Sequence, residues 1–439
     1  MKVMSAVLVV LALAAATPSP MQDDSARVVL ISIDGLMPAD ISGDTGIPVV
    51  RALAQNGMYA DGAISVLPSL TFAAHTTLIT GVPPAVHGIL DNKILDPEGK
   101  ADDAWYWYAR DLEVPSLPTV VKANRGRVAS IWWPATVGLE VDTLVPEFWR
   151  SLHPETLSLL RALSSPRRLF DDVQEAAGRP IAIPVTDRSK TDLAIHALKT
   201  LDPHLLMLHL GELDSARHMN GPESVAAGAA LTRINLYVTE ILDAVKAAGR
   251  LDRTTIAIVS DHGFLPVRTT LQPNAAFKAA GLLTTDAHGT IAAWEAYFHS
   301  SGGSGFVYLN KAERASRVRS ILEDLKRDPR HGIRTIWAAE ELRGFGAHPG
   351  AAFGLDMVDG FYTGGGHDQL LKAETLKGGH GFDPRRPEMH AALVLSGAAV
   401  QRRGAIGIVP ITRIAQTLAG ILGMTLPPPA AEPLPLTRN

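Results

Sequence analysis

The 439-residue sequence predicts an α/β fold in which a mostly parallel sheet is covered by helices on both faces. Three short runs of aliphatic and β-branched residues have the length and composition of buried strands: Val28–Ile33, Leu205–Leu210 and Thr254–Val259. Between the last two runs lies Val225–Ala248, where apolar residues recur at helical spacing. Strands that alternate with helices are typical of parallel sheets buried on both sides.

The N-terminus has the pattern of a secretory signal. Lys2 is followed by an almost wholly apolar run from Val3 to Ala16, which ends in small residues. The run is shorter than the ~20 residues that span a bilayer. We therefore expect residues 1–16 to be a cleaved signal peptide and the mature chain to be periplasmic or secreted, without a transmembrane segment.

The segment from Leu67 to Gly81 predicts a helix that begins at Leu70 or Thr71. Gly81 provides a C-terminal stop, and the prolines that follow it prevent continuation. Thr71 would then stand at the positive end of the helix, where an anion or alkoxide is stabilised. Two interpretations of Thr71 remain open: a helix cap, or a nucleophile whose hydroxyl is deprotonated by a metal.

The rest of the chain is predicted as one catalytic domain over residues 26–426. A region of about 293–366 fits the alternating pattern poorly and contains glycine-rich stretches at 300–305 and 364–366, which favours a loop-rich inserted cap. His390–Leu395 predicts a further strand and Ile411–Leu422 a further helix. The Pro-rich residues 427–439 are expected to form a surface tail.

Composition limits the chemistry. The chain has no cysteine and 15 histidines, so a metal would be bound by imidazole, carboxylate or hydroxyl groups. Disulfide scaffolds and thiol catalysis are excluded. The formal net charge of −4 argues against a surface for polymeric nucleic acid.

An aspartate follows each of the three predicted strands: Asp34, Asp214 and Asp261. Ligands of open α/β sheets bind at the edge where the carboxyl ends of the strands lie. An aspartate after a strand often only caps a helix, but here imidazoles accompany the carboxylates. Asp214 and His218 are four residues apart, which places them on one face of a helix. The candidate metal ligands are Asp34, Asp214, His218, Asp261, His262 and His380.

In their order along the chain, these residues resemble the nucleotide pyrophosphatase/phosphodiesterase branch of the alkaline phosphatase superfamily. The motifs that carry the resemblance are Asp34-Gly35, Thr71-Phe72, His87-Gly88-Ile89, Asn92, Asp214-Ser215, His218, Gly221-Pro222, Ser260-Asp261-His262-Gly263 and Gly379-His380-Gly381. The resemblance extends from about Val28 to Leu426. It implies an alkaline-phosphatase-like three-layer α/β/α sandwich.

The resemblance also implies a site with two Zn²⁺ ions, although the same ligands accept other divalent metals. One ion would be bound by Asp34, Asp261 and His262, with Thr71 bound to it as the nucleophile. The other would be bound by Asp214, His218 and His380. The implied reaction is hydrolysis of a phosphodiester or nucleotide pyrophosphate through a phosphothreonine. Asn92 would donate a hydrogen bond to a phosphoryl oxygen.

Two positions depart from the family pattern. His209 stands where relatives often have a tyrosine that stacks on a base, and Arg217 stands where they usually have glycine. The predicted substrate is therefore a small-molecule phosphoester or nucleotide, with Phe72, Asn92 and His209 as candidate contacts. The aromatic residues 105–108, Trp132 and Trp133 are expected either to line an apolar slot or to pack in the core.

Two alternatives remain. A phosphomonoesterase would need cations for the additional phosphate charge, and Lys93, Arg110 and Arg217 are the candidates. A non-catalytic metal-binding protein would have no need of Thr71. The sequence does not indicate the oligomeric state.

Overall fold

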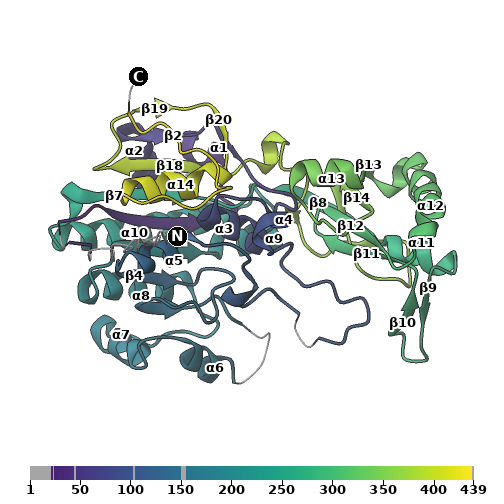
Figure 1. Ribbon diagram of the computed structural model, residues 1–439, viewed down its shortest axis with the longest axis horizontal. Coiled ribbons are helices and arrows are strands. Elements are labelled where there is room, and N and C mark those ends of the chain that lie inside the picture. The colour runs from purple at the N-terminus through teal and green to yellow at the C-terminus, as the bar shows by residue number, and fades with distance from the viewer. Residues whose placement is uncertain (1–20, 23, 44–45, 102–103, 150–154, 438–439) are drawn as a thin grey trace, which may run out of the picture.

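The computed structural model describes residues 21–22, 24–43, 46–101, 104–149 and 155–437 (Figure 1). The predicted signal peptide, residues 1–16, lies outside these ranges. No helix within them is both long enough and apolar enough to cross a membrane.

An eight-stranded sheet forms the centre of the molecule, in the order β19-β2-β18-β7-β1-β6-β4-β5. Its strands are β1 (Arg27–Ile33), β2 (Met58–Tyr59), β4 (Val128–Ile131), β5 (Thr143–Val145), β6 (Leu205–Leu210), β7 (Thr254–Val259), β18 (Leu393–Gly397) and β19 (Gly404–Ala405). The five strands β7, β1, β6, β4 and β5 are parallel, and β18 is antiparallel to β7. The predicted α/β fold with a mostly parallel sheet is thus confirmed.

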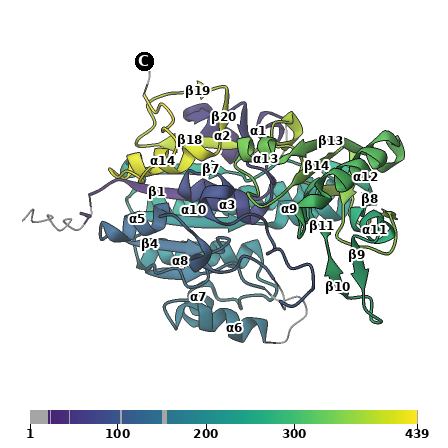
Figure 2. The ribbon, with the colours of Figure 1, turned by 45° about the vertical axis from the view of Figure 1, so that its right-hand side comes forward.

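Helices cover both faces of this sheet (Figures 1 and 2). On one face lie α2 (Pro48–Asn56), α6 (Thr156–Leu163), α7 (Leu169–Ala177), α8 (Asp187–Thr200) and α10 (Val225–Ala247). On the other lie α3 (Thr71–Thr80), α5 (Leu117–Ala123) and α14 (Thr412–Ile421). The strand β1 contributes Val29, Ile31 and Ile33 to the first core, and Val28 and Leu30 to the second. This alternation explains why its sequence is continuously apolar.

Shorter elements complete this part of the chain. They are α1 (Pro38–Ser42), α4 (Pro84–His87), α9 (Glu212–Asn220), the parallel pair β3 (Gly62–Ile64) and β20 (Ile408–Pro410), and the 3₁₀ turns η1 (Ala109–Asp111), η2 (Leu251–Arg253) and η5 (Pro387–Met389). The strand predicted at His390–Leu395 begins only at Leu393, because residues 387–389 form η5 and Ala391 pairs with Ala63 instead.

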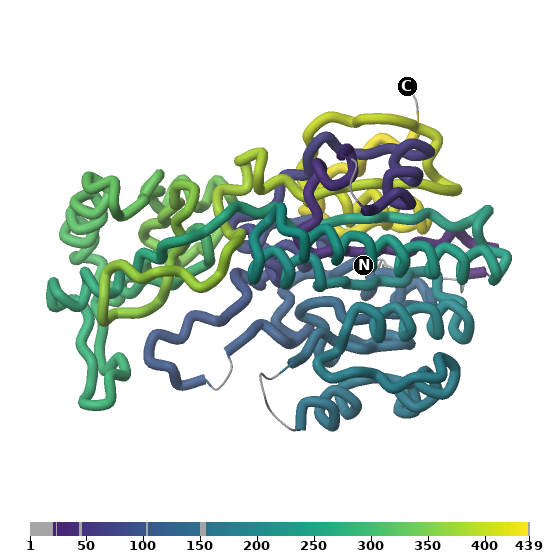
Figure 3. Tube along the Cα trace, turned by 180° about the vertical axis from the view of Figure 1, so that it is seen from behind, coloured from purple at the N-terminus to yellow at the C-terminus, as the bar shows by residue number. Residues whose placement is uncertain are grey.

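Residues 265–379 form a second unit, which we call the cap. It projects from one end of the main sheet and is green in Figures 1 to 3. Its strands are β8 (Leu265–Leu271), β9 (Leu283–Thr285), β10 (Ile291–Trp294), β11 (Ala296–Ser301), β12 (Ser304–Leu309), β13 (Ile333–Ala338), β14 (Phe353–Met357), β15 (Gly360–Thr363), β16 (Leu371–Ala373) and β17 (Gly378–Gly379). Its helices are α11 (Pro273–Ala279), α12 (Ala315–Arg327) and α13 (Ala339–Phe345), with the turns η3 (Ala312–Arg314) and η4 (Pro329–His331).

The cap is larger and more regular than the loop-rich insertion expected at about 293–366. The glycines at 302 and 303 turn a hairpin between β11 and β12 instead of forming a long loop. Gly302 has a φ of +77°, and a Cβ on Gly303 would come within 2.2 Å of Phe382. These glycines therefore serve a tight turn against a packed ring.

The described part of the Pro-rich C-terminal segment, residues 427–437, lies on the surface as predicted and is anchored at one buried residue. Leu434 is 3% exposed and joins the core beside α14. Its backbone N–H donates to the Thr417 hydroxyl at 2.7 Å.

Candidate metal centre and pocket

The three predicted aspartates lie at the same edge of the sheet because their strands are neighbours, in the order β7-β1-β6. Asp34 directly follows β1, and Asp261 follows β7 by two residues. Asp214 lies on the first turn of α9, which begins two residues after β6. Parallel strands bring these carboxylates together although they are far apart in the sequence.

The first predicted group of ligands is compact and buried. The ligand atoms of Asp34, Asp261 and His262 lie within 4.8 Å of one another. The Nε2 atom of His262 is 3.4 Å from Asp34 Oδ1 and 3.1 Å from Asp261 Oδ2. These three residues can bind one metal ion.

The second predicted group adjoins the first. The Nε2 atom of His218 is 3.3 Å from Asp214 Oδ1 and 3.1 Å from His380 Nε2. The ring of His380 stacks on that of His262, with centroids 3.6 Å apart. The atoms of Asp214, His262 and His380 also lie within 4.8 Å of one another. The two groups therefore form one continuous cluster.

Each imidazole in this cluster is oriented by a backbone carbonyl. The Nδ1 atoms of His218, His262 and His380 lie 2.9, 3.2 and 3.0 Å from the carbonyl oxygens of Gly378, Gly263 and Ser69. An Nδ1–H that donates to a carbonyl leaves Nε2 with a free lone pair, as in metal-binding histidines. When these rings are neutral, their three Nε2 atoms present lone pairs to the same space.

The unpartnered atoms of the cluster fit divalent cations. Asp34 Oδ1, Asp214 Oδ1, Asp261 Oδ2 and His262 Nε2 are buried and lack a hydrogen-bond partner among the described residues. Burial, together with the nearby charges of Asp261 and Asp214, raises the pKa of Asp34 to about 8. Burial and His262 lower the pKa of His380 to about 3, so that this ring is neutral. Oxygen and imidazole donors crowded in this way suit zinc or a similar ion.

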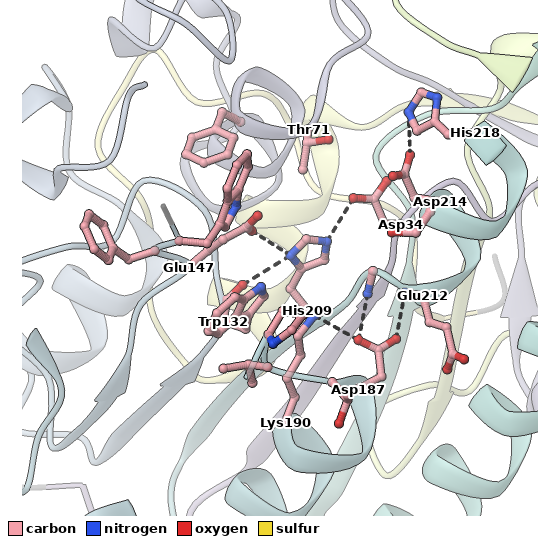
Figure 4. Close-up of a pocket in the computed structure, with 18 of the residues that line it drawn as sticks. Asp34, Thr71, Trp132, Glu147, Asp187, Lys190, His209, Glu212, Asp214 and His218 are labelled. Carbon is pink, nitrogen blue, oxygen red and sulfur yellow. Dashed lines mark hydrogen bonds and ion pairs between the residues drawn. The ribbon is translucent and has the colours of Figure 1, made fainter. Parts of the chain in front are cut away.

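Thr71 is the first residue of α3, as predicted, and Gly81 ends the helix with a φ of +74°. Leu70, not Thr71, is the N-cap residue. The Thr71 side chain lies beside Asp34 in the pocket (Figure 4). Asn92 also lines the pocket, and its Oδ1 accepts a hydrogen bond of 2.9 Å from the backbone N–H of Phe72. Because this oxygen already accepts a hydrogen bond, the group of Asn92 that can interact with a ligand is its amide nitrogen, which is a donor.

The pocket is a cavity of about 1170 Å³ that extends from the ligand cluster to an aromatic wall. Phe72, Trp105, Phe148 and Trp149 line this wall. Trp105 lies between Phe72 and Trp149, with ring centroids 5.3 and 4.8 Å apart. Both alternatives predicted for the aromatic residues occur. Trp105 and Trp132 line the cavity, whereas Trp107 and Trp133 are buried in the two cores.

A family model described as type I phosphodiesterase / nucleotide pyrophosphatase matches residues 28–343, which include every predicted ligand except His380. The chain belongs to this family.

Curated relatives of the family agree with this assignment. An uncharacterized pyrophosphatase/phosphodiesterase of Schizosaccharomyces pombe is 24% identical over 440 residues, covering 94% of this chain and 80% of that protein. Ectonucleotide pyrophosphatase/phosphodiesterase family member 1 of Rattus norvegicus is 27% identical over 255 residues. That match covers 56% of this chain but only 24% of the rat protein.

Solved structures of the family share the fold. Murine ectonucleotide pyrophosphatase/phosphodiesterase 5, in an inactive form in complex with AMP, superimposes with a TM-score of 0.65 at 18% identity. The match covers 92% of this chain and 96% of that one. It supports the alkaline-phosphatase-like architecture implied by the sequence.

His209, at the position where family members often have a stacking tyrosine, lies in the pocket wall behind Asp34 (Figure 4). It is 2% exposed, and both ring nitrogens have protein partners. Nε2 is 3.0 Å from Asp34 Oδ2, and Nδ1 is 2.9 Å from Glu147 Oε2. The ring is therefore committed to the Asp34 carboxylate and is not free to stack on a substrate.

Arg217, at the family's glycine position and one of the cations considered for a phosphomonoesterase, does not line the pocket. It is 2% exposed, and its guanidinium donates to Asp40 Oδ1 at 2.6 Å and to the Gly35 carbonyl. Lys93 and Arg110 lie over the rings of Trp105 and Tyr108 and do not line the cavity either.

Five charged pocket residues were not predicted from the sequence: Glu147, Asp187, Arg188, Lys190 and Glu212. Asp187 accepts hydrogen bonds of 3.0 and 2.9 Å from the N–H groups of Gly211 and Glu212, where α9 begins, and pairs with buried Lys190 at 2.8 Å. Glu147 follows β5 by two residues, as Asp261 follows β7, but β5 has only three residues. A strand this short gives no recognisable periodicity in the sequence. Glu147 could therefore not be identified as an acidic residue that follows a predicted strand.

Proposed function

We propose that the protein hydrolyses phosphodiester or nucleotide pyrophosphate bonds of small molecules, with Thr71 as the nucleophile and two divalent metal ions, preferably zinc, as cofactors. The observation that carries the proposal is the convergence of three imidazole Nε2 atoms and three carboxylates beside Thr71. Family membership supports the reaction class.

Asp34, Asp261 and His262 would bind one ion, and Asp214, His218 and His380 the other. When bound, such ions lower the pKa of a coordinated hydroxyl and neutralise charge on the phosphoryl group. His209 holds the Asp34 carboxylate in orientation through its bond of 3.0 Å.

In the proposed first step, the Thr71 oxygen attacks phosphorus and loses its proton. The bond from phosphorus to the leaving oxygen breaks, and that oxygen takes up a proton. In the second step, water attacks the phosphothreonine and loses a proton, the bond from phosphorus to the Thr71 oxygen breaks, that oxygen takes up a proton, and the phosphate monoester product leaves. The Asn92 amide, oriented by Phe72 N–H, donates to a non-bridging oxygen in both steps.

The pocket favours a diester over a monoester. Its lining cations, Arg188 and Lys190, are already paired with carboxylates, so neither is free to neutralise the second charge of a monoester. The aromatic wall offers apolar contact to the group esterified to the phosphate, with Phe72 as the predicted contact.

We further propose that the chain is exported. The signal-like N-terminus supports this location, as do relatives named ectonucleotide pyrophosphatases.

The test uses purified protein with zinc and three substrates: bis-p-nitrophenyl phosphate, the p-nitrophenyl ester of thymidine 5′-monophosphate, and p-nitrophenyl phosphate. We expect turnover of the two diesters to exceed that of the monoester. Thr71→Ala is expected to abolish turnover while metal content, measured by elemental analysis, stays at two ions per chain. Thr80→Ala on the same helix is the matched control, since Thr80 only bonds to the Thr76 carbonyl. A preference for the monoester, or turnover by Thr71→Ala, would refute the proposal.

A further inference from the structure

A buried polar network joins the cap to the loop that carries Asn92. Asp91, which directly precedes Asn92, is 2% exposed. Its Oδ2 atom accepts a hydrogen bond from the hydroxyl of Ser301 in the cap. The Nε2 atoms of His299 and His348, also in the cap and buried, each lie 3.7 Å from the same oxygen.

The protonation of this network follows from its contacts. Burial raises the pKa of Tyr308, so its hydroxyl keeps its proton and donates to His348 Nδ1. His348 then carries its proton on Nε2, toward Asp91. Neither His299 Nε2 nor His348 Nε2 has a hydrogen-bond partner among the described residues, so Asp91 is the charged group that both face. Burial by itself would raise the pKa of Asp91, but the facing histidines lower it below its usual value and keep the carboxylate ionised.

The second oxygen of Asp91 holds the backbone of the loop. Asp91 Oδ1 accepts from the N–H of Asn92 at 2.7 Å and from the N–H of Lys93 at 3.3 Å. Because Asn92 Oδ1 is bound to Phe72 N–H, the residue is fixed from both sides, by α3 and by Asp91. The carboxylate of Asp91 is thus the link between the cap and the backbone of Asn92.

We propose that Asp91 is a positioning residue, and that the cap, through Ser301 and His348, holds the Asn92 amide in its working orientation. This inference rests on the proposed role of Asn92 as a donor to the phosphoryl group. It assigns to the cap an indirect part in catalysis, through the orientation of Asn92, although the cap supplies no predicted metal ligand.

The kinetic test compares kcat and KM on the preferred diester. Asp91→Asn keeps the shape of the side chain and removes its charge; we expect kcat to fall about 10-fold or more while KM changes less than about twofold. His348→Gln and Ser301→Ala are expected to lower kcat in the same way, by a smaller factor. His331→Gln is the matched control, since this cap histidine bonds to the Leu325 carbonyl and does not contact Asp91. We expect its kcat to be unchanged.

A double-mutant cycle separates positioning from a general loss of structure. If Asp91 acts through Asn92, then Asn92→Ala combined with Asp91→Asn has the same kcat as Asn92→Ala alone. Multiplicative losses would overturn the proposal, and so would an Asn92→Ala variant with unchanged kcat.

Hydrogen exchange tests the same link without turnover, so failure of the proposed hydrolase activity can be told apart from failure of this inference. In His348→Gln and Ser301→Ala, amide exchange in a peptide covering residues 89–94 should accelerate, while exchange in α3 stays unchanged. Unchanged exchange at 89–94 in both variants would contradict a cap that holds this loop, whatever the enzyme hydrolyses.

Discussion

At the scale of single residues, the geometry of the cluster depends on the groups that form hydrogen bonds to the candidate ligands. Three histidines are oriented by carbonyl oxygens, and Asp34 is oriented by His209. These partners explain how side chains from four separate segments present their metal-binding atoms to one space. That these candidate ligands lie together could be predicted from the sequence, because strand ends and motif order mark them. Their partners could not, since the contact of Glu147 with His209 joins positions with no recognisable pattern.

Glu147→Gln should weaken metal binding about 10-fold, because it removes the charge that holds His209 against Asp34. Competition with a chromophoric zinc chelator measures the affinity. Glu140→Gln, an exposed neighbour in the sequence, serves as the control and should bind zinc as the parent protein does. Equal affinities for Glu147→Gln and the parent protein would remove His209 from the positioning role.

At the scale of secondary-structure elements, α9 and α3 bear the functional groups and are fastened by buried polar contacts. Arg217 binds α9 to the turn after β1 and to Asp40 in α1.

The core elements were predictable because they are long: β6 and β7 match their expected residues, and α3 begins and ends as expected. The cap was not predictable in the same way, because some of its strands, such as β10 and β16, are short and partly exposed, and part of its glycine content serves a tight turn.

Arg217→Met should lower the free energy of unfolding by about 3–5 kcal/mol, because it removes the cation from a buried pair and leaves Asp40 without it. Urea unfolding with excess chelator measures the effect apart from metal binding. Adding Asp40→Asn to Arg217→Met should recover part of the loss. A change below about 1 kcal/mol would show that the pair is not a buried charge contact of the expected kind.

The junction of α3 and α4 predicts a dependence on pH. His87 accepts a hydrogen bond from Ile89 N–H at Nδ1, and its Nε2 bonds to the Thr77 hydroxyl. Burial lowers the pKa of His87 from 6.5 to about 3. Between pH 6.5 and 3, the unfolded chain therefore binds a proton at His87 that the folded chain does not bind. The free energy of unfolding is not reduced by this difference above pH 6.5, and it falls by ~1.4 kcal/mol per pH unit as the pH is lowered toward 3.

His87→Asn keeps an acceptor for Ile89 N–H but does not titrate. We expect the parent protein to be the more stable at pH 7, and the difference in unfolding free energy to shrink as pH is lowered to 4.5, as measured by urea unfolding. His288→Asn, at an exposed histidine, should show a difference that does not depend on pH. A constant difference for His87→Asn would refute the buried neutral state.

At the scale of the whole molecule, the ligands come from positions 34 to 380, so the cluster exists only when the sheet and the cap are both formed. Metal bound only by the folded chain stabilises it by mass action, by about 2.7 kcal/mol at a free metal concentration 100 times the Kd. Addition of zinc to chelator-treated protein should therefore raise the Tm in a scanning fluorescence experiment. A triple variant with Asp34→Asn, Asp214→Asn and His262→Gln should lose this rise. A Tm of the parent protein that does not respond to zinc would contradict the metal centre.

The two ends of the cap meet beside the cluster, where Gly379 pairs with Leu265 and the ring of His380 lies on that of His262. An insertion whose ends are joined in this way can change in length or sequence without altering the distance between the residues that flank it. A chimera carrying the corresponding segment of a relative, exchanged between residues 265 and 379, should therefore fold and retain both ligand groups. In evolutionary terms, the junction would let the insertion diverge in sequence while the residues on either side of it keep their spacing.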